Sequence, residues 1–180
     1  MKAFWMICAL CLCTTIATAQ SYRALRTTTD VACVLPAAAG VTMGIIAKDH
    51  RGLLQLGLSE ASTLAVNYAL ELSIRKQRPA GNGEHAFPST HTAFAFAGAT
   101  HLQKRYGWKL GVPALAVATG VAIGRVCAKR HDVWDVLAGA AIGTCSSLLL
   151  TKKYSNGTVM TAAPMLTPEG GQGISVNVTF

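Results

Sequence analysis

The sequence has few charged residues, and acidic ones are the scarcest. Charged side chains make up 13% of the 180 residues, and eight Asp and Glu stand against sixteen Lys and Arg. The carboxylates do not cluster along the chain, so the sequence lacks the oxygen ligands of a calcium or magnesium site. We therefore expect no metal and no other cofactor.

Cysteine is present, but without the spacing of a zinc site. Three of the six cysteines fall in the first twenty residues, and the other three, Cys33, Cys127 and Cys145, form no C-x-x-C pair. This odd remainder argues against metal binding. Three buried thiols are the favoured interpretation, and a Cys127 to Cys145 disulfide in an oxidising compartment is the alternative.

Aromatic residues are also scarce, at 7% of the chain, and they do not alternate with Lys and Arg in a basic stripe. The sequence contains no DNA- or RNA-binding motif, so a nucleic-acid partner is disfavoured. The formal net charge of +8 instead fits an anionic lipid or a phosphorylated substrate. Nothing in the sequence indicates the oligomeric state.

Residues 1–19 have the features of an export signal peptide. Lys2 gives a positive start, the stretch 4–16 is apolar, and Ala17-Thr18-Ala19 supplies the small residues of a cleavage site. An uncleaved first membrane span is the alternative, because the apolar stretch is only slightly short for one. In both cases the chain after Gln20 emerges outside the cytoplasm.

Five apolar runs fill the region 20–154, for which we predict an all-α domain. The hydrophobic share of the chain is 51%, and the Ala and Gly content of the runs favours close packing of helices. If the N-terminal segment is retained, the bundle has six helices. The runs are 31–47, 53–74, 92–102, 110–124 and 133–150.

A membrane-embedded bundle is favoured over a compact soluble one, although most runs fall at or just below the ~20 residues that span a bilayer. If each run crosses once, the basic turns 48–51, 104–109 and 152–153 lie on the cytoplasmic side, as the positive-inside tendency requires. Two segments rich in His and Arg then share the outer side. Arg23 and Arg26 count against this arrangement.

The tail 155–180 differs from the rest of the chain. Residues 174–180 alternate strictly between apolar and polar, and a Gly-rich turn at 167–173 separates them from a second extended stretch. This pattern predicts a β-hairpin, which we interpret as a packing appendage.

Three short blocks carry the chemistry: Arg78-Pro79, Pro88-Ser89-Thr90-His91, and Gly124-Arg125-x5-His131-x3-Asp135. Their order and spacing resemble the K-x6-R-P, P-S-G-H and S-R-x5-H-x3-D pattern of the type 2 phosphatidic acid phosphatase (PAP2) superfamily, which also includes class A acid phosphatases and vanadium haloperoxidases. Thr90 replaces the family Gly, and Gly124 replaces the family Ser. Three blocks in register are far more specific than any one of them.

The resemblance implies a phosphatase that works through a phosphohistidine intermediate. His131 would be the nucleophile, Asp135 would hold one of its ring N–H groups, and His91 would protonate the leaving group and then activate water. Ser89 and Thr90 begin a predicted helix, whose free N–H groups would help to bind phosphate. The remaining histidines match no block and are interpreted as structural: His50, His85 and His101.

Arg78 and Arg125 match the phosphate-binding arginines of the family, and each can donate paired N–H groups to phosphate oxygens. One position departs from the pattern, because Glu71 stands where the family has lysine, and a carboxylate would repel phosphate. Arg75, one helical turn further on and on the same face, is placed either to pair with Glu71 or to take over the phosphate contact. Lys76 is the second candidate.

The favoured function is a metal-independent phosphatase of a lipid phosphate or pyrophosphate, in the inner membrane with its site facing the periplasm. Its partners would be the phosphorylated lipid and the surrounding membrane lipids. A soluble periplasmic acid phosphatase of broad specificity is the first alternative. A non-catalytic membrane protein that holds a phosphorylated head group is the second, because of Glu71. No motif indicates which lipid is bound.

Overall fold

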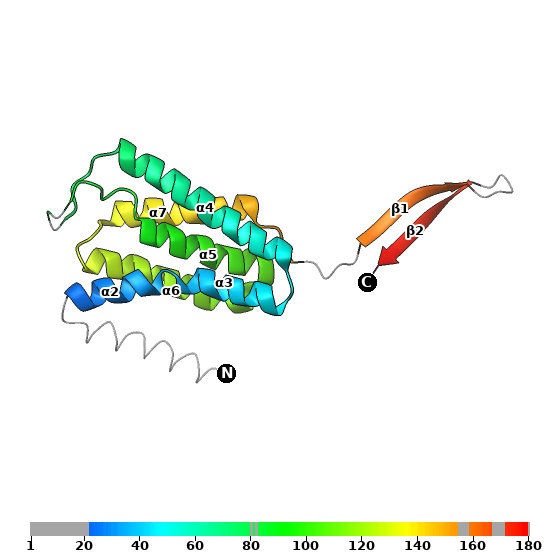
Figure 1. Cartoon of the computed structure of the whole chain (residues 1–180), viewed down its shortest axis with the longest axis horizontal. Helices are drawn as coiled ribbons and strands as arrows, with labels where there is room; N and C mark the ends of the chain where they lie inside the picture. The colour runs from blue at the N-terminus through cyan, green and yellow to red at the C-terminus, as the bar shows by residue number, and fades with distance from the viewer. Residues whose placement is uncertain (1–21, 80, 82, 155–158, 167–171, 180) are drawn as a thin grey trace, which may run out of the picture.

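A computed structural model describes residues 22–79, 81, 83–154, 159–166 and 172–179. Six helices in this part of the chain form a bundle in which α5 packs against four neighbours, α3, α4, α6 and α7 (Figure 1). The signal peptide predicted for residues 1–19 lies outside the described residues. The helices are α2 (Tyr22–Ala32), α3 (Leu35–Ile46), α4 (His50–Ser73), α5 (Thr90–Tyr106), α6 (Trp108–Cys127) and α7 (Val133–Leu150).

Helices α3 to α7 coincide with the five apolar runs, so the prediction of a mostly helical domain is confirmed. The polar segment before the first run is helical as well and forms α2, which leads into α3 after a break at residues 33–34. Pro36 is in the first turn of α3, where a missing N–H costs no helical hydrogen bond. If α2 and α3 are taken as one broken helix, the bundle has five.

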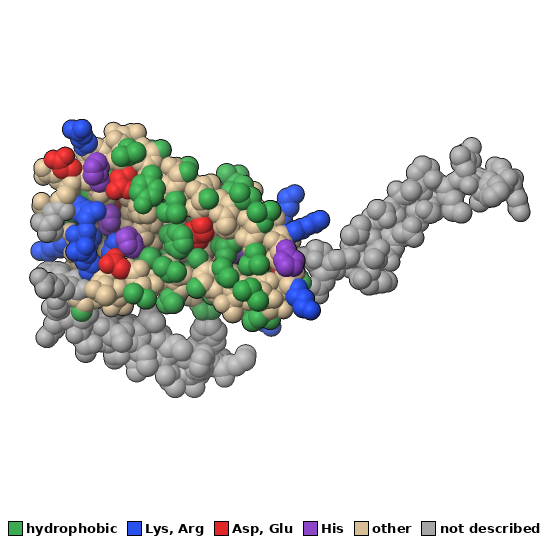
Figure 2. Space-filling model, viewed as in Figure 1, with side chains coloured by type: hydrophobic (Ala, Val, Ile, Leu, Met, Phe, Trp, Pro, Cys, Tyr) green, Lys and Arg blue, Asp and Glu red, His purple; other side chains and the backbone are tan. Residues whose placement is uncertain are grey.

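Among the described residues, three segments are long and apolar enough to cross a membrane: Ala24–Ile46, Trp108–Cys127 and Val133–Leu150. Large apolar side chains also point outward, and Figure 2 shows them spread along the helices between the two ends of the bundle. Ile46, Leu72 and Leu149 are 70%, 76% and 84% exposed. Hydrocarbon accepts such a surface whereas water does not, so the bundle has the surface of a membrane protein.

Small residues bring α5 and α7 into backbone contact. A Cβ atom added to Gly139 would lie 2.5 Å from the carbonyl oxygen of Ser89, and one added to Gly143 would lie 2.0 Å from that of Ala93. The Ser89 N–H also donates to the carbonyl of Asp135 at 3.0 Å. The first turn of α5 is therefore fixed against the first turns of α7.

The basic turns lie together at one end of the bundle, as the single-crossing arrangement predicted. The Arg105 guanidinium at the end of α5 donates to Asp49 in the turn after α3 and to the carbonyl of Lys152 after α7. The Tyr154 N–H donates to the Arg105 carbonyl at 2.9 Å. This ionic cluster joins the turns 48–51 and 104–109 to the segment 152–154.

Beyond the bundle, strand β1 (Val159–Leu166) pairs antiparallel with β2 (Gln172–Thr179). The turn that would connect them, residues 167–171, lies outside the described residues. The predicted hairpin as a whole therefore stays a prediction.

The cysteines correct one expectation. Cys33 is buried, but Cys127 and Cys145 are exposed, and all three are free thiols. The interpretation of three buried thiols is wrong for the last two, because they lie on the outward faces of α6 and α7, where a membrane-type bundle presents apolar groups.

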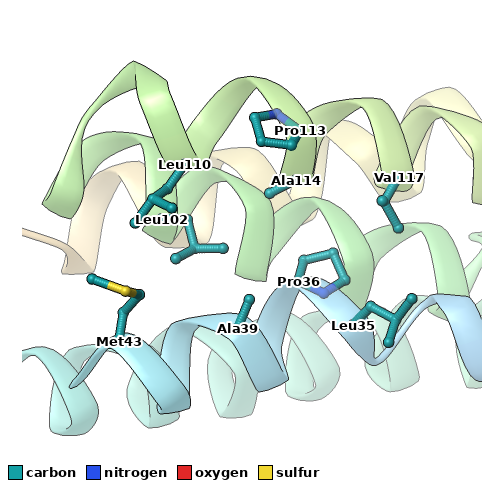
Figure 3. Close-up of a pocket in the computed structure, with 9 residues that line it drawn as sticks. All are labelled: Leu35, Pro36, Ala39, Met43, Leu102, Leu110, Pro113, Ala114 and Val117. Atoms are coloured by element: carbon teal, nitrogen blue, oxygen red, sulfur yellow. The ribbon is translucent and has the colours of Figure 1, made fainter. Parts of the chain in front are cut away.

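An apolar cavity of about 230 Å³ lies between α3, α5 and α6 (Figure 3). It carries no charged or hydrogen-bonding side chain, so it offers nothing that could hold or attack a phosphate. The nine residues that line it are Leu35, Pro36, Ala39, Met43, Leu102, Leu110, Pro113, Ala114 and Val117.

Candidate active site

The opposite end of the bundle contains a pocket of about 290 Å³, and Figure 2 shows blue and purple side chains gathered in the hollow there. Residues from α2, α4, α5, α6 and the loops after α4 and α6 line it. Segments that are about forty residues apart in the sequence thus meet in one pocket. The lining residues are Arg26, Asp30, Tyr68, Glu71, Arg78, His85, Pro88, Thr90, His91, Arg125, Arg130 and His131.

The loop between α4 and α5 folds back on itself beside this pocket. The Ala86 N–H donates to the Lys76 carbonyl at 3.0 Å, and the Arg78 N–H donates to the Gly83 carbonyl at 3.0 Å. The turn contains Gly81 and Gly83 at φ values of +73° and +124°, which residues with a Cβ rarely adopt. The fold-back brings the Arg78 side chain and the Ala86 carbonyl to the pocket.

His131, in the loop before α7, is held by that carbonyl. Its Nδ1 lies 2.8 Å from the Ala86 oxygen, and because a carbonyl can only accept, Nδ1 carries the proton. Burial lowers the pKa of His131 to about 4, so the ring is neutral at physiological pH. The lone pair of Nε2 is therefore free for nucleophilic attack.

Asp135 does not make the expected hydrogen bond to His131. The closest approach, from Oδ2 to Nδ1, is 3.8 Å. Helix α7 begins only at Val133, so His131 lies outside the helix, and Asp135 is engaged elsewhere: its Oδ2 accepts from the Asp132 N–H at 2.9 Å in a capping box. Asp135 thus acts on His131 through its charge rather than through a hydrogen bond.

Lys76 ties these groups together. Its Nζ lies 2.6 Å from Asp135 and 2.5 Å from Asp132. Burial opposes the charge of Lys76, but the hydrogen bonds to both carboxylates outweigh burial and raise the pKa of Lys76. The hydrogen bond from Lys76 to Asp132 lowers the pKa of Asp132. The backbone of Lys76 holds Ala86, and its side chain holds Asp135, so both groups beside Nδ1 of His131 depend on it.

His91 and Arg125 form a second cluster across the pocket. Arg125 is 3% exposed, and its Nη2 lies 2.5 Å from Nδ1 of His91. Its Nη1 donates to Asp30 at 2.6 Å and to the Thr29 hydroxyl at 3.3 Å. Nε2 of His91 lies 3.1 Å from the same oxygen of Asp30.

The pocket is equipped to bind an anion with several oxygens. Arg78, Arg125 and Arg130 each have a buried Nε–H without a hydrogen-bond partner in the described part of the chain. With Arg26, four guanidinium groups line the pocket against two carboxylates, which leaves an excess of two positive charges. A phosphate dianion would balance this excess of positive charge and accept hydrogen bonds from the guanidinium groups that line the pocket.

Other predicted residues have different places. Thr90 lines the pocket, and Asn67 of α4 donates to its hydroxyl at 2.8 Å. Ser89 is the N-cap residue of α5, but it is buried, is not among the lining residues, and shares a hydrogen bond with the Thr92 hydroxyl. Arg75 is exposed and lies outside the pocket lining.

Several lining residues were not predicted. Asp30 and Arg26 belong to α2, a segment that matches no family block. His85, interpreted as structural, lies at the rim with Nδ1 at 3.1 Å from a backbone carbonyl. Among these unpredicted lining residues, Arg130 is the one that the sequence could have indicated, because it directly precedes His131 in the third block.

The family model of the PAP2 superfamily matches residues 67–158, which is half of the chain and includes the three blocks. The chain belongs to the PAP2 superfamily. The resemblance inferred from the sequence is thereby confirmed. In this PAP2 protein the three blocks lie in the α4–α5 loop, at the start of α5, and from the end of α6 to the first turn of α7.

Two curated relatives of this PAP2 protein are phosphatases. Lipid A 4'-phosphatase of Helicobacter pylori is 31% identical over 136 residues, which cover 69% of this chain and 68% of that protein. Lipid A 1-phosphatase of Porphyromonas gingivalis is 40% identical over 74 residues, covering 39% of this chain and 17% of that protein. The chain is a phosphoric monoester hydrolase of the PAP2 type.

Two solved structures share the fold. LpxE of Aquifex aeolicus has a TM-score of 0.55 and 21% identity, covering 71% of this chain and 90% of its own. The first transmembrane PAP2-type phosphatidylglycerolphosphate phosphatase from Bacillus subtilis has a TM-score of 0.59 and 23% identity, covering 83% and 85%. The likeness to a transmembrane enzyme agrees with the apolar outer surface of this bundle.

Proposed function

We propose that this PAP2 protein removes a phosphate group from a lipid, through a phosphohistidine formed on His131. One observation carries the proposal: a neutral histidine with a free Nε2 lines a pocket together with the N–H donors of four arginines. Such donors stabilise the charge that develops on phosphate oxygens in the transition state.

Two steps complete the reaction. Nε2 of His131 attacks phosphorus, the bond to the lipid oxygen breaks, and His91, doubly protonated in the enzyme–substrate complex, gives one proton to that oxygen. His91 then takes a proton from water, which attacks the phosphohistidine, releases inorganic phosphate and regenerates Nε2. Asp135 balances the positive charge on the ring of the intermediate, while Arg78 and Arg125 hold the transferred phosphoryl oxygens.

A lipid substrate is supported by a groove that continues from the pocket. The groove has a volume of about 340 Å³ and shares Asp30, Thr90 and His91 with the pocket. Its other end is lined by apolar residues, among them Leu64 and Phe94. A phosphate in the pocket could therefore carry a hydrocarbon chain along the helices. Lipid A phosphates are the first substrates to test, because both curated relatives are named lipid A phosphatases.

We also infer that the protein lies in the inner membrane and that its pocket faces the periplasm. The opposite end carries the basic turns 48–51, 104–109 and 152–153, which the positive-inside tendency assigns to the cytoplasm. A membrane-impermeant maleimide applied to spheroplasts tests the orientation in a cysteine-free variant. A cysteine introduced at Glu84 should react, and one at Lys153 should not; the reverse pattern rejects the orientation.

The function is tested with the purified full-length protein in detergent. Phosphate release is measured from lipid A, phosphatidate, phosphatidylglycerol phosphate and undecaprenyl pyrophosphate, with and without a chelator. We expect His131→Ala to lose at least a thousandfold in kcat, and the exposed His50→Ala at the other end to retain activity. Full activity in His131→Ala would reject the mechanism, and loss of activity with the chelator would reject metal independence.

A further inference from the structure

The Asp30 carboxylate contacts both Arg125 and His91, the two residues of the second cluster that have a role in the proposed reaction. One of its oxygens lies 2.6 Å from Nη1 of Arg125 and 3.1 Å from Nε2 of His91. No family block includes this position, and the side chain, at the end of α2, is 40% exposed. Asp30 therefore occupies the same donors that a phosphate oxygen would need.

The hydrogen bonds fix the state of His91. Arg125 can only donate, so Nδ1 of His91 accepts from it, and the ring proton resides on Nε2 and is donated to Asp30. Both ring nitrogens are thus occupied. In this arrangement His91 has no nitrogen free to protonate a leaving oxygen or to accept a proton from water.

The other charged or titratable groups that act on His91 are Arg130 and His131, besides Arg125 and Asp30. Of these four groups only Asp30 is anionic. An incoming phosphate therefore competes with one carboxylate for the cations around His91.

Asp30 also lies at the boundary between the charged pocket and the apolar groove, since it lines both. A lipid phosphate that reaches the pocket along the groove would meet Asp30 before it reaches Arg78 or Arg130. The Asp30 carboxylate and a phosphate dianion bound to the same donors would repel each other, so the two anions cannot share those donors.

We propose that Asp30 is an internal anion that holds Arg125 and His91 in the substrate-free enzyme and is displaced by the phosphate of the substrate. Displacement transfers the Nη1 hydrogen bond of Arg125 to a phosphate oxygen and frees Nε2 of His91 from Asp30. The inference rests on the proposed function for the role of His91. The anion exchange itself requires only that phosphate enters the pocket.

The competing role is a permanent positioning contact, in which Asp30 stays bound and orients both partners. The two roles predict opposite changes when the charge of Asp30 is removed. A displaced anion weakens phosphate binding, so its removal strengthens it. A positioning residue supports phosphate binding, so its removal weakens it.

The experiment compares Asp30→Asn with Glu84→Gln, which removes the same charge from an exposed residue outside the pocket. Binding of inorganic phosphate to the purified full chain is measured by titration calorimetry, and KM and kcat are measured with a lipid phosphate. We expect Asp30→Asn to bind phosphate about tenfold more tightly and to lower KM, while Glu84→Gln behaves as the wild type. Unchanged or weaker phosphate binding in Asp30→Asn overturns the proposal.

Two further variants keep the test decisive. If the melting temperature shows that Asp30→Asn does not fold, Asp30→Ser replaces it, with the same expected direction. Asp30→Glu keeps the charge and should not gain affinity; a gain equal to that of the neutral variant overturns the proposal.

The calorimetric measurement separates this inference from the proposed function. Tighter phosphate binding without turnover of any lipid would reject the proposed function and support the role of Asp30. Lipid turnover by the wild type, with no gain of phosphate affinity in the neutral variant, would do the reverse.

Discussion

Two buried arginines at opposite ends of the bundle have opposite surroundings. Arg105 is 6% exposed, and all three of its guanidinium nitrogens have partners: Asp49 accepts from two of them, and Gln55 and the Lys152 carbonyl accept from the third. Arg125 is 3% exposed, yet its Nε–H has no acceptor among the described residues. One cluster is complete and the other is not.

The difference teaches how to separate structure from function in a bundle with few charges. A buried cation costs free energy unless it is paired, so a complete cluster such as that of Arg105 has its partners within the protein. In the cluster around Arg125 the cation is paired with Asp30, which is partly exposed and lies at the pocket. The buried pairing of Arg105 and the partly exposed pairing of Arg125 thus agree with the location of the site that the motifs give.

Replacing each arginine by methionine tests this contrast, and the largest expected effect is on activity. We expect Arg125→Met to lower kcat/KM by about a hundredfold to a thousandfold, since one donor to the transition-state charge is lost. Its melting temperature should change little, because its partner Asp30 is partly exposed and stays solvated. Phosphate release and thermal unfolding measure the two quantities. Arg51→Met, at an exposed position, is the control. An equal loss of kcat/KM in Arg51→Met would mean that the loss in Arg125→Met is not specific to the pocket.

Arg105→Met should show the reverse pattern. It leaves Asp49 buried without its cation, which destabilises the fold by about 3–5 kcal/mol, while the folded fraction keeps nearly normal kcat. Arg105 lowers the pKa of Asp49 to about 2. The ion pair therefore stabilises the fold fully at pH values above the ordinary carboxyl pKa, and this stabilisation is lost as the pH falls through about 2. Denaturant unfolding at pH 7 measures the loss. An active, equally stable variant would contradict a structural role.

Lys76 tests a connection within the site. Lys76→Met frees Asp132 and Asp135, so we expect kcat to fall about tenfold with little change in KM, because His131 loses its support while the phosphate-binding arginines remain. Lys76→Arg should recover part of kcat. Exposed Lys109→Met is the matched control. A rise in KM at constant kcat would instead indicate that Lys76 binds the substrate.

The sequence predicted those parts of the molecule that depend on local pattern. Apolar runs located α3 to α7, and the three blocks located His131, His91, Arg78 and Arg125, because spacing along the chain is enough to recognise them. Contacts between distant segments could not be predicted in this way. Nothing near His131 in the sequence indicates that its proton is held by Ala86 rather than by a carboxylate.

Residues that act through α2 were missed for the same reason. Asp30 belongs to a polar segment that we did not predict to be helical, although its apolar residues fall on one face of α2, which packs against α6. Its role comes from a contact with Arg125, which is 95 residues away in the chain. Pairings of that kind leave no periodicity and no motif, so only the structure reveals them.

The smallest expected effect comes from Glu71, which lines the cationic pocket and makes no side-chain hydrogen bond to a described residue. Glu71→Lys introduces the family lysine, and we expect inorganic phosphate to bind about threefold to tenfold more tightly, because a repulsive charge becomes attractive across partly solvated space. Glu84→Lys makes the same charge change outside the pocket and should not alter phosphate binding. Titration calorimetry at low and high salt measures both variants, and the gain should shrink at high salt. Weaker binding in Glu71→Lys would mean that the carboxylate is needed in the pocket, so that its excess of positive charge is not what binds the phosphate.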